Sequence, residues 1–366
     1  MKKKILYLAV TTALVLSSCS NDETTAVNQG EAISFRSSVS GTTRAADITT
    51  TNLLSFTVNA MNAGTETSYF SDVYNRVNET STFTSNTKHY WPPTSSLDFY
   101  AYSPAGNGQV TYTNYKTFTV TPSTDIASQV DLVYAATKGK NRSTSATGVV
   151  LNFRHTGAKI ACKVQNTSST LKFGVDGWKV GYLYPNGTFV FADANTDGKN
   201  TGSGTTLTFA QWTPGGTKAY SVEYASTFTK KDIAVNASAT DLDGEFVLVP
   251  QTLTAATAYA NSGTAAVGDK LNNTFIAVKL YILNSTGSEL VAGGGDTTNP
   301  TTIWAIWPTG GYNWEPGKKY TYTIDLAGGG YYETNQNTDE DLDALLPNVE
   351  IKFINVTVDD WTTVNQ

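Results

Sequence analysis

Residues able to carry out catalysis are scarce in this sequence. The chain has two histidines, His89 and His155, far apart in the sequence. His155 has the same parity as Leu151 and Phe153 in an alternating segment, so we expect a hydrogen-bonded core histidine and not a general base. No GxSxG, HExxH or phosphate-binding loop is present. We therefore predict that the protein is not an enzyme and has no cofactor.

Two acidic segments offer oxygen ligands for a cation. Asp193 to Asp197 begins like a calcium-binding loop, but Gly204 stands where the closing bidentate glutamate belongs. Asp339 to Asp343 opens a segment, 339–346, that we expect to be helical, because acids suit its first turn and Pro347 would end it. We assign no metal ligands, and cation binding at either segment stays an open alternative.

Cys19 could accept lipid. Lys2 to Lys4 and the apolar run from Ile5 to Leu16 have the charged and apolar regions of a signal peptide, and the run is too short to span a bilayer. It ends in Leu16-Ser17-Ser18-Cys19, which resembles the lipobox of bacterial lipoproteins. We expect residues 1–18 to be the signal peptide and Cys19 to carry diacylglyceryl and palmitate chains. An ordinary signal peptide with an incidental cysteine is the alternative.

Residues 19–44 have the composition of a tether or propeptide that contains one strand. The chain is polar up to Gly30, and then Ala32 to Arg36 alternates, which predicts a half-buried strand with Ile33 and Phe35 inward. Arg44-Ala45 follows in a small-residue loop that a protease could bind in extended form. A merely solvated arginine is the alternative.

Composition indicates an acidic, β-rich protein. The net charge is −6, and loss of the three signal lysines makes it more negative, which argues against nucleic acid and anionic membrane surfaces as partners. Hydrophobic residues make up 40% and charged residues 15% of the chain, with many Thr, Tyr, Val and Gly. With Cys19 acylated, Cys162 has no partner, and we expect it to be a small buried hydrophobe.

Short alternating segments separated by Gly, Asn and Pro follow one another after Arg44, so we predict an all-β fold of sandwiches or barrels. This part of the chain is longer than one core usually organises, and we expect two domains, 45–145 and 146–366. The basic, small-residue segment from Lys138 to Thr147 is the predicted linker. Pro185-Asn186-Gly187 predicts a hairpin between the strands on either side of it.

Six segments then carry a family resemblance. They are Trp91-Pro92 with Leu97 to Tyr102, Asp131 to Ala135, Leu151 to His155, Phe246 to Gln251, Trp314 to Tyr322, and Val356 to Trp361. In this order, together with Cys19 and Thr43-Arg44-Ala45, they resemble the fimbrillin-like (Mfa-like) lipoproteins that build protease-assembled pili.

The resemblance implies two transthyretin-like β-sandwich domains in tandem and a lipoprotein held in the outer membrane through Cys19. It further implies cleavage after Arg44 by an Arg-specific protease, and assembly with other fimbrillin-like subunits into a fimbrium by donor-strand exchange, in support of adhesion. Only five residues follow Trp361, so a donor strand would lie mostly within 349–361. Its alternate side chains would be Ile351 and Phe353, or Ile354, Val356 and Val358. Shaft and tip positions both remain open.

A monomeric surface lipoprotein that binds host or bacterial glycans or proteins is the alternative function. Such a protein would keep residues 20–44 as a permanent tether and would need exposed aromatic side chains. Most of the aromatic residues, which make up 11% of the chain, are better explained as core or cross-strand pairs.

Overall fold

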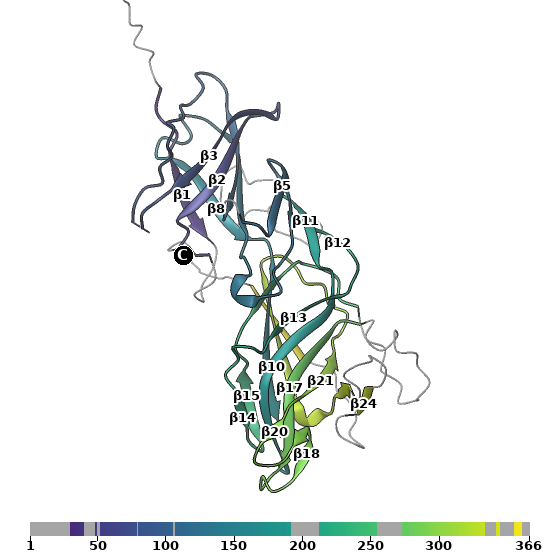
Figure 1. Ribbon diagram of the computed structural model, residues 1–366. Helices are drawn as coiled ribbons and strands as arrows, with labels where there is room; N and C mark the ends of the chain where they lie inside the picture. Colours follow the sequence, from purple (N-terminus) through teal and green to yellow (C-terminus); the bar gives the residue numbers. More distant parts are fainter. Residues whose placement is uncertain are drawn as a thin grey trace, which may run out of the picture.

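The computed structural model is all-β over the residues it describes, as predicted (Figure 1). These are residues 30–39, 48–49, 52–78, 80–104, 107–191, 212–254, 273–333, 342–344 and 355–360. Within them the only helical segments are two 3₁₀ turns, η1 (Ile126–Ser128) and η3 (Leu326–Gly328). No helix there is long and apolar enough to cross a membrane. The strands form two lobes, one above the other in Figure 1, and give the molecule an elongated shape.

The N-terminal lobe contains a six-stranded and a four-stranded sheet. The first has the order β1-β8-β7-β4-β2-β3 and the second the order β12-β11-β6-β5. Their bounds are β1 Phe35–Val39, β2 Ser55–Asn62, β3 Thr67–Asn75, β4 Leu97–Ser103, β5 Val110–Asn114, β6 Thr117–Val120, β7 Val133–Lys140, β8 Val149–His155, β11 Asn186–Val190 and β12 Trp212–Gly215.

The six-stranded sheet curls until its two edges meet. Phe35 on β1 and Tyr74 on β3, at opposite ends of the strand order, have ring centroids 4.7 Å apart. The concave face encloses a hydrophobic core that includes Phe56, Phe99 and Phe153. The other face packs against the four-stranded sheet through a second core. β2 and β4 thus contribute to both cores, Phe56 and Phe99 to the first and Met61 and Tyr100 to the second.

The C-terminal lobe is a pair of facing sheets. One has the order β13-β10-β17-β21-β23-β24, with β14 on β10 and β18 on β17, and the other has the order β15-β9-β22-β25, with β16 on β9. Their bounds are β9 Ala158–Asn166, β10 Leu171–Leu183, β13 Tyr220–Tyr224, β14 Lys231–Ile233, β15 Ala237–Asp241, β16 Phe246–Leu248, β17 Phe275–Asn284, β18 Leu290–Ala292, β21 Ile303–Pro308, β22 Lys318–Asp325, β23 Tyr331–Glu333, β24 Leu342–Ala344 and β25 Asn355–Asp360; β19 (Gly294–Gly295) and β20 (Pro300–Thr301) pair separately.

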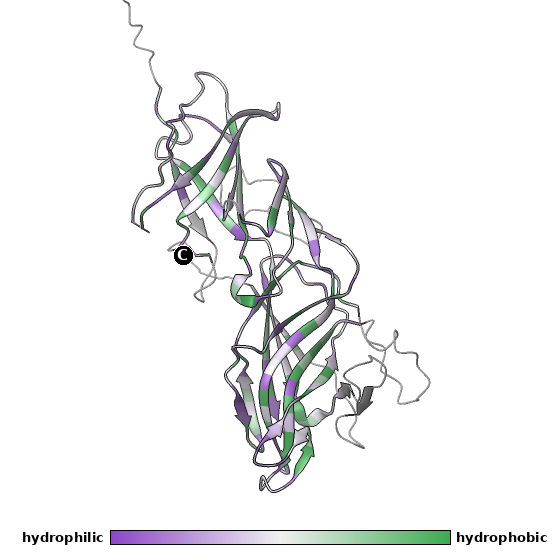
Figure 2. Ribbon diagram, viewed as in Figure 1, coloured by the Kyte–Doolittle hydropathy of each residue, from purple (hydrophilic) through white to green (hydrophobic). Residues whose placement is uncertain are grey.

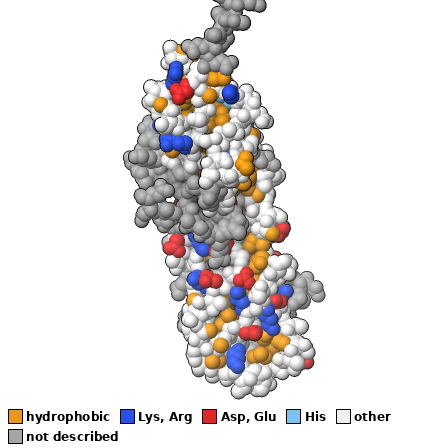
Figure 3. Space-filling model, turned by 90° about the vertical axis from the view of Figure 1, so that its left-hand side faces the viewer, with side chains coloured by type: hydrophobic (Ala, Val, Ile, Leu, Met, Phe, Trp, Pro, Cys, Tyr) orange, Lys and Arg blue, Asp and Glu red, His pale blue; other side chains and the backbone are white. Residues whose placement is uncertain are grey.

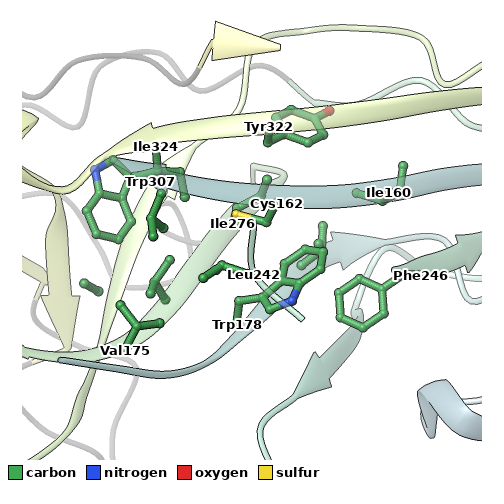
Figure 4. Close-up of a cluster of buried hydrophobic side chains, with 14 of the residues drawn as sticks. Ile160, Cys162, Val175, Trp178, Leu242, Phe246, Ile276, Trp307, Tyr322 and Ile324 are labelled. Carbon is green, nitrogen blue, oxygen red and sulfur yellow. The ribbon is translucent and has the colours of Figure 1, made fainter. Parts of the chain in front are cut away.

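One large core lies between these two sheets (Figure 4). Trp178, Trp307 and Tyr322 are almost completely buried in it. Cys162 is buried among them, as predicted, and burial raises the pKa of its thiol. Hydrophobic and hydrophilic residues alternate along the strands of both lobes, as expected for sheets that each face a core (Figure 2).

The predicted linker, Lys138 to Thr147, is instead the end of β7 and the turn that leads into β8. The two strands pair with each other through Val133–His155 and Tyr134–Arg154, so β8 belongs to the N-terminal lobe although it follows residue 145. Lys138 to Ser145 has no apolar residue because most of it is an exposed turn. Val149, Leu151 and Phe153 place β8 in the N-terminal core, so the sheets do not divide at residue 145.

The predicted hairpin around Pro185-Asn186-Gly187 is also wrong. β10 pairs with β13, β14 and β17, whereas β11 pairs with β6 and β12 in the other lobe. The register shifts between Val180 and Leu183, and Tyr182 has a left-handed φ of 61°. Pairing of β10 with β17 ends at Gly181, and pairing with β13 ends at Leu183. Phe189 then packs against Phe118, with ring centroids 5.0 Å apart.

The helix predicted over 339–346 is contradicted where the structure describes it. Leu342–Ala344 is the strand β24, which pairs antiparallel with β23. Pairing at a sheet edge overrides the local preference for helix that the acidic residues indicated. The remaining residues of this segment lie outside the described residues.

Candidate functional site

The chain before the predicted cleavage site lies between two walls of the N-terminal lobe. We call residues 31–39 the N-terminal strand. On one side it runs parallel to β8, from Phe35 opposite Val149 to Val39 opposite Phe153. On the other side its first residues pair antiparallel with residues 89–91, where the Ile33 N–H donates to the His89 carbonyl at 2.8 Å. We call the site formed by these walls and the side chains beneath them the strand groove.

Two side chains of the N-terminal strand fill the core beneath it. Ile33 is 5% and Phe35 4% exposed, while Ser34 and Arg36 face solvent, as the alternation predicted. The Phe35 ring meets three other rings edge-on, those of Phe56, Tyr74 and Phe99, with centroids 5.9, 4.7 and 5.4 Å away. Burial of each side chain contributes about 1.5–3 kcal/mol. The strand is therefore part of the core of this lobe.

Gly148 lets the strand approach the start of β8. It has a φ of 100°, and a Cβ built on it would lie 3.0 Å from Ser34 Oγ and 3.3 Å from the Ser34 carbonyl oxygen. At this place the Val149 N–H donates to the same carbonyl at 2.8 Å. Any other residue would be strained and would press against the N-terminal strand.

The second wall is fixed by side chains of β3. His89 stacks on Phe70, with ring centroids 3.9 Å apart, and its Nε2 lies 2.8 Å from Asp72 Oδ2. The Tyr69 hydroxyl donates to the Tyr90 carbonyl at 2.8 Å. Partial burial opposes ionisation of Asp72, but hydrogen bonds from His89 and from the Val73 N–H outweigh it and lower the pKa of this carboxyl.

A hollow of about 500 Å³ lies where the N-terminal strand enters the groove. Its lining residues are Glu31, Pro92, Pro93, Thr94, Ser95, Asn141, Arg142, Ser143 and Ala146. Arg142 Nε lies 3.2 Å from Glu31 Oε2, and both side chains are largely exposed, so this ion pair contributes about 0–1 kcal/mol. The ion pair therefore helps to position the N-terminal strand at the entrance of the groove and adds little to the stability of the fold.

The structure describes only some of the other predicted site residues. Cys19, Arg44 and Ala45 lie outside the described residues, as do Ile351, Phe353 and Ile354 of the candidate donor strand. Val356 and Val358 lie on β25, at the edge of the C-terminal lobe beside β22, where Val356 packs against the core. The structure therefore brings together Ile33 and Phe35, and it places Val356 in the other lobe.

Both histidines lie in the described part of the chain, and each pairs with an aspartate. His155 is 3% exposed and its Nδ1 bonds Asp131 Oδ1 at 2.9 Å, which confirms the predicted core histidine. No group of three potential ligands occurs in the described part of the chain. Asp193 to Asp197 lies outside it, and of Asp339 to Asp343 it includes only residues 342 and 343, in β24. On the face shown in Figure 3, acidic and basic side chains are interspersed over the C-terminal lobe.

The sequence did not indicate the residues that line the groove. Phe56 and Phe99 were recognisable as inward-facing strand residues, but nothing showed that their rings meet Phe35. Gly148 and His89 were missed as well. The one available signal was a glycine directly before an alternating apolar segment. This signal does not identify which strand approaches the glycine.

A search with protein-family models matches residues 43–361 to the fimbrillin-like family. The chain belongs to the fimbrillin-like family. No curated protein sequence matches it. The family match includes Arg44 and both lobes, and the resemblance based on the six short segments is confirmed.

Several solved structures align with this chain at low sequence identity. A fimbrial protein from Bacteroides vulgatus aligns with a TM-score of 0.54 and 14% identity, over 90% of this chain and 99% of that one. Candidate cell adhesion proteins align with lower TM-scores: that from Bacteroides uniformis with 0.45 and 14% identity, over 90% and 98% of the two chains, and that from Bacteroides ovatus with 0.44 and 15% identity, over 92% and 99%. The first of these matches supports the fold of the fimbrillin-like chain.

Proposed function

We propose that this fimbrillin-like chain is a structural subunit of a cell-surface pilus, made ready for assembly by cleavage after Arg44. One observation carries the proposal: the strand before the predicted cut fills the N-terminal core with Ile33 and Phe35. A passive tether would have no reason to supply two core side chains and a ladder along β8.

Cleavage changes how firmly this strand is held without changing its contacts. In the uncut chain the strand has a high effective concentration at its own groove, since it is covalently linked to the lobe. After the cut it becomes a separate chain that a competitor can displace. The vacated groove then offers the edge of β8 and two apolar pockets, which favours addition of a strand from another subunit.

The candidate donor strand repeats the spacing of the strand it would replace. Ile33-Ser34-Phe35 and Ile351-Lys352-Phe353 both read Ile-x-Phe. Alternate residues of an extended chain fall on one face, so Ile351 and Phe353 suit the pockets of Ile33 and Phe35. Val356 packs on the C-terminal core, so we favour Ile351 and Phe353 over Ile354, Val356 and Val358 as the inserted pair.

The proposal also includes the route to the cell surface. Export follows the signal peptide, residues 1–18, and lipid on Cys19 anchors the precursor in the outer membrane. An Arg-specific protease and other fimbrillin-like subunits are the required partners. Cys19→Ala is expected to abolish labelling with radioactive fatty acid, and retained labelling would contradict the lipoprotein assignment.

Arg44→Ala tests the assembly mechanism. We expect the variant to stay monomeric and cell-bound in the presence of the protease, whereas wild type forms ladders of oligomers on non-boiled gels. Arg36→Ala is the matched control, because Arg36 is an exposed arginine of the N-terminal strand, before the predicted cut, and its loss should leave assembly unchanged.

Phe353→Asp tests the donor. A carboxylate at this position cannot enter an apolar pocket without a large desolvation cost, so the variant should accept a neighbour's strand but not donate its own. If trimmed wild-type protein stays monomeric even with other family subunits supplied, strand exchange is the wrong mechanism. A monomeric glycan-binding lipoprotein would then be the better explanation.

A further inference from the structure

A buried acid of the N-terminal lobe binds the chain just after the predicted cleavage site. Asp131, which precedes β7, is 4% exposed, and His155 at the end of β8 is 3% exposed. One carboxylate oxygen of Asp131 bonds His155 Nδ1 at 2.9 Å. The other accepts the main-chain N–H of Ile48 at 2.8 Å. Both oxygens of this buried carboxylate are therefore engaged, one of them by a residue four positions beyond Arg44.

The residues that follow Ile48 are also held. Ile48 packs against the core that contains Phe35. The Leu53 N–H donates to the Thr49 carbonyl at 2.9 Å, and Leu53 is 1% exposed. The Arg76 side chain donates to the Leu53 carbonyl at 2.8 Å. The chain is thus fixed to the lobe on the far side of the predicted cut.

A carboxylate in this position is costly unless donors satisfy it. Burial of an ionised acid is unfavourable, and an apolar side chain would fill the same volume without that cost. Detachment of Ile48 would remove this donor from Asp131 Oδ2, an oxygen of a residue that is only 4% exposed. The acid therefore makes departure of this segment unfavourable.

We propose that the Asp131–His155 pair is a fixed attachment point for the segment after the cut, so that cleavage after Arg44 releases only the chain before it. This inference rests on the proposed function, since it explains why the cut frees the N-terminal strand without loosening the rest of the lobe. Asp131 acts here as a positioning residue. His155 supports it by donating to the other oxygen.

Hydrogen exchange of the full, uncut chain tests the attachment. In Asp131→Ala, the amides of Ile48 and Leu53 should exchange roughly 10- to 100-fold faster relative to those of β17 in the other lobe, because the hydrogen bond to Asp131 is lost. Asp72→Ala is the matched control: Asp72 also pairs with a histidine, His89, but does not contact Ile48. It should leave both amides unchanged. Equal exchange in wild type and Asp131→Ala would overturn the proposal.

Ile48→Pro keeps the proposal testable if Asp131→Ala fails to fold. It removes the N–H donor and leaves the Asp131–His155 pair in place, and the Leu53 amide should again exchange faster. An unchanged Leu53 amide in a folded Ile48→Pro variant would count against the attachment.

The third test of the attachment uses the cleaved protein. After digestion with an Arg-specific protease, an excess of a synthetic peptide spanning residues 30–39 should exchange with the released strand while Ile48 stays protected. Exchange of Ile48 at the rate of a free peptide after cutting would overturn the attachment even if the protein polymerises. Polymerisation failing with Ile48 still protected would overturn only the proposed function.

Discussion

The two lobes complete their cores in different ways. In the C-terminal lobe the core lies between two sheets built from residues on the same side of the predicted cut. In the N-terminal lobe the curled sheet contains Ile33 and Phe35, which come from the other side of it. Only the N-terminal lobe therefore depends on a segment that the predicted cut would detach. Changes to the N-terminal strand should therefore affect one lobe, and changes to the ion pairs of Glu245 with Lys159 and Lys319 the other.

Phe35→Ala should have the largest effect. Loss of a buried phenylalanine side chain costs about 3–5 kcal/mol, here with the loss of three aromatic contacts. Hydrogen exchange should show faster opening of β1, β2 and β8 while the C-terminal core keeps its protection. Arg36→Ala, one residue along the strand and exposed, is the control and should change little. Equal loosening of both lobes by Phe35→Ala would contradict the dependence of the N-terminal lobe alone on this strand.

Glu245→Gln should destabilise the C-terminal lobe and leave the N-terminal lobe unchanged. Glu245 bonds Lys159 Nζ at 3.0 Å and Lys319 Nζ at 2.7 Å, and its side chain is 7% exposed. Burial opposes its ionisation, but the two lysines outweigh this and lower its pKa. Removal of the carboxylate leaves the buried Lys159 ammonium group without this counter-charge, whereas Lys319 is partly exposed. The change should cost about 3 kcal/mol, measured by denaturant unfolding.

The control for this change is Asp241→Asn. Asp241 also pairs with a lysine, Lys163, at 3.2 Å, but its side chain is 62% exposed. Its loss should cost less than about 1 kcal/mol. If the two variants are equally stable, burial of Glu245 with its two lysines adds nothing to the stability of the C-terminal lobe.

Acid should loosen the N-terminal lobe through Asp72, with the smallest effect of the three. The pKa of Asp72 is lower in the folded protein, so its contribution is present above the ordinary aspartate pKa and is lost as the pH falls through the folded value. Hydrogen exchange at residues 31–33 should rise in this acid range, and Asp72→Asn should already show the rise at neutral pH. Asp296 lies in the C-terminal lobe, and its pKa is also lowered, by hydrogen bonds from the main-chain N–H groups of Asn299 and Thr298. Asp296→Asn should leave residues 31–33 unchanged.

Local patterns in the sequence predicted the elements better than their partners. Alternation identified the inward positions of the N-terminal strand and of β8, because parity depends only on the extended backbone. The hairpin at Asn186 was wrong because a turn signal does not say which sheet the next strand joins. Phe189 finds its neighbours on β6, about seventy residues earlier in the chain.

The candidate site was partly predictable for the same reason. Ile33 and Phe35 were expected to be inward, and they are. The edge-on contact of Phe35 with Tyr74 depends on the curl of a six-stranded sheet, which no short segment encodes. The bond between Asp131 and the Ile48 amide joins residues 83 positions apart through a main-chain group, and this leaves no trace in residue types.

The return of β11 and β12 to the N-terminal lobe has a mechanical consequence. The chain passes between the lobes three times within the described residues, from β8 to β9, from β10 to β11 and from β12 to β13. Tension along the long axis is therefore shared by three covalent crossings. To part the lobes, a pulling force would have to shear β11 from β6 or β10 from β17 instead of merely straightening a flexible joint. We expect a molecule pulled along this axis to resist as one stiff rod and to lengthen only when a sheet ruptures.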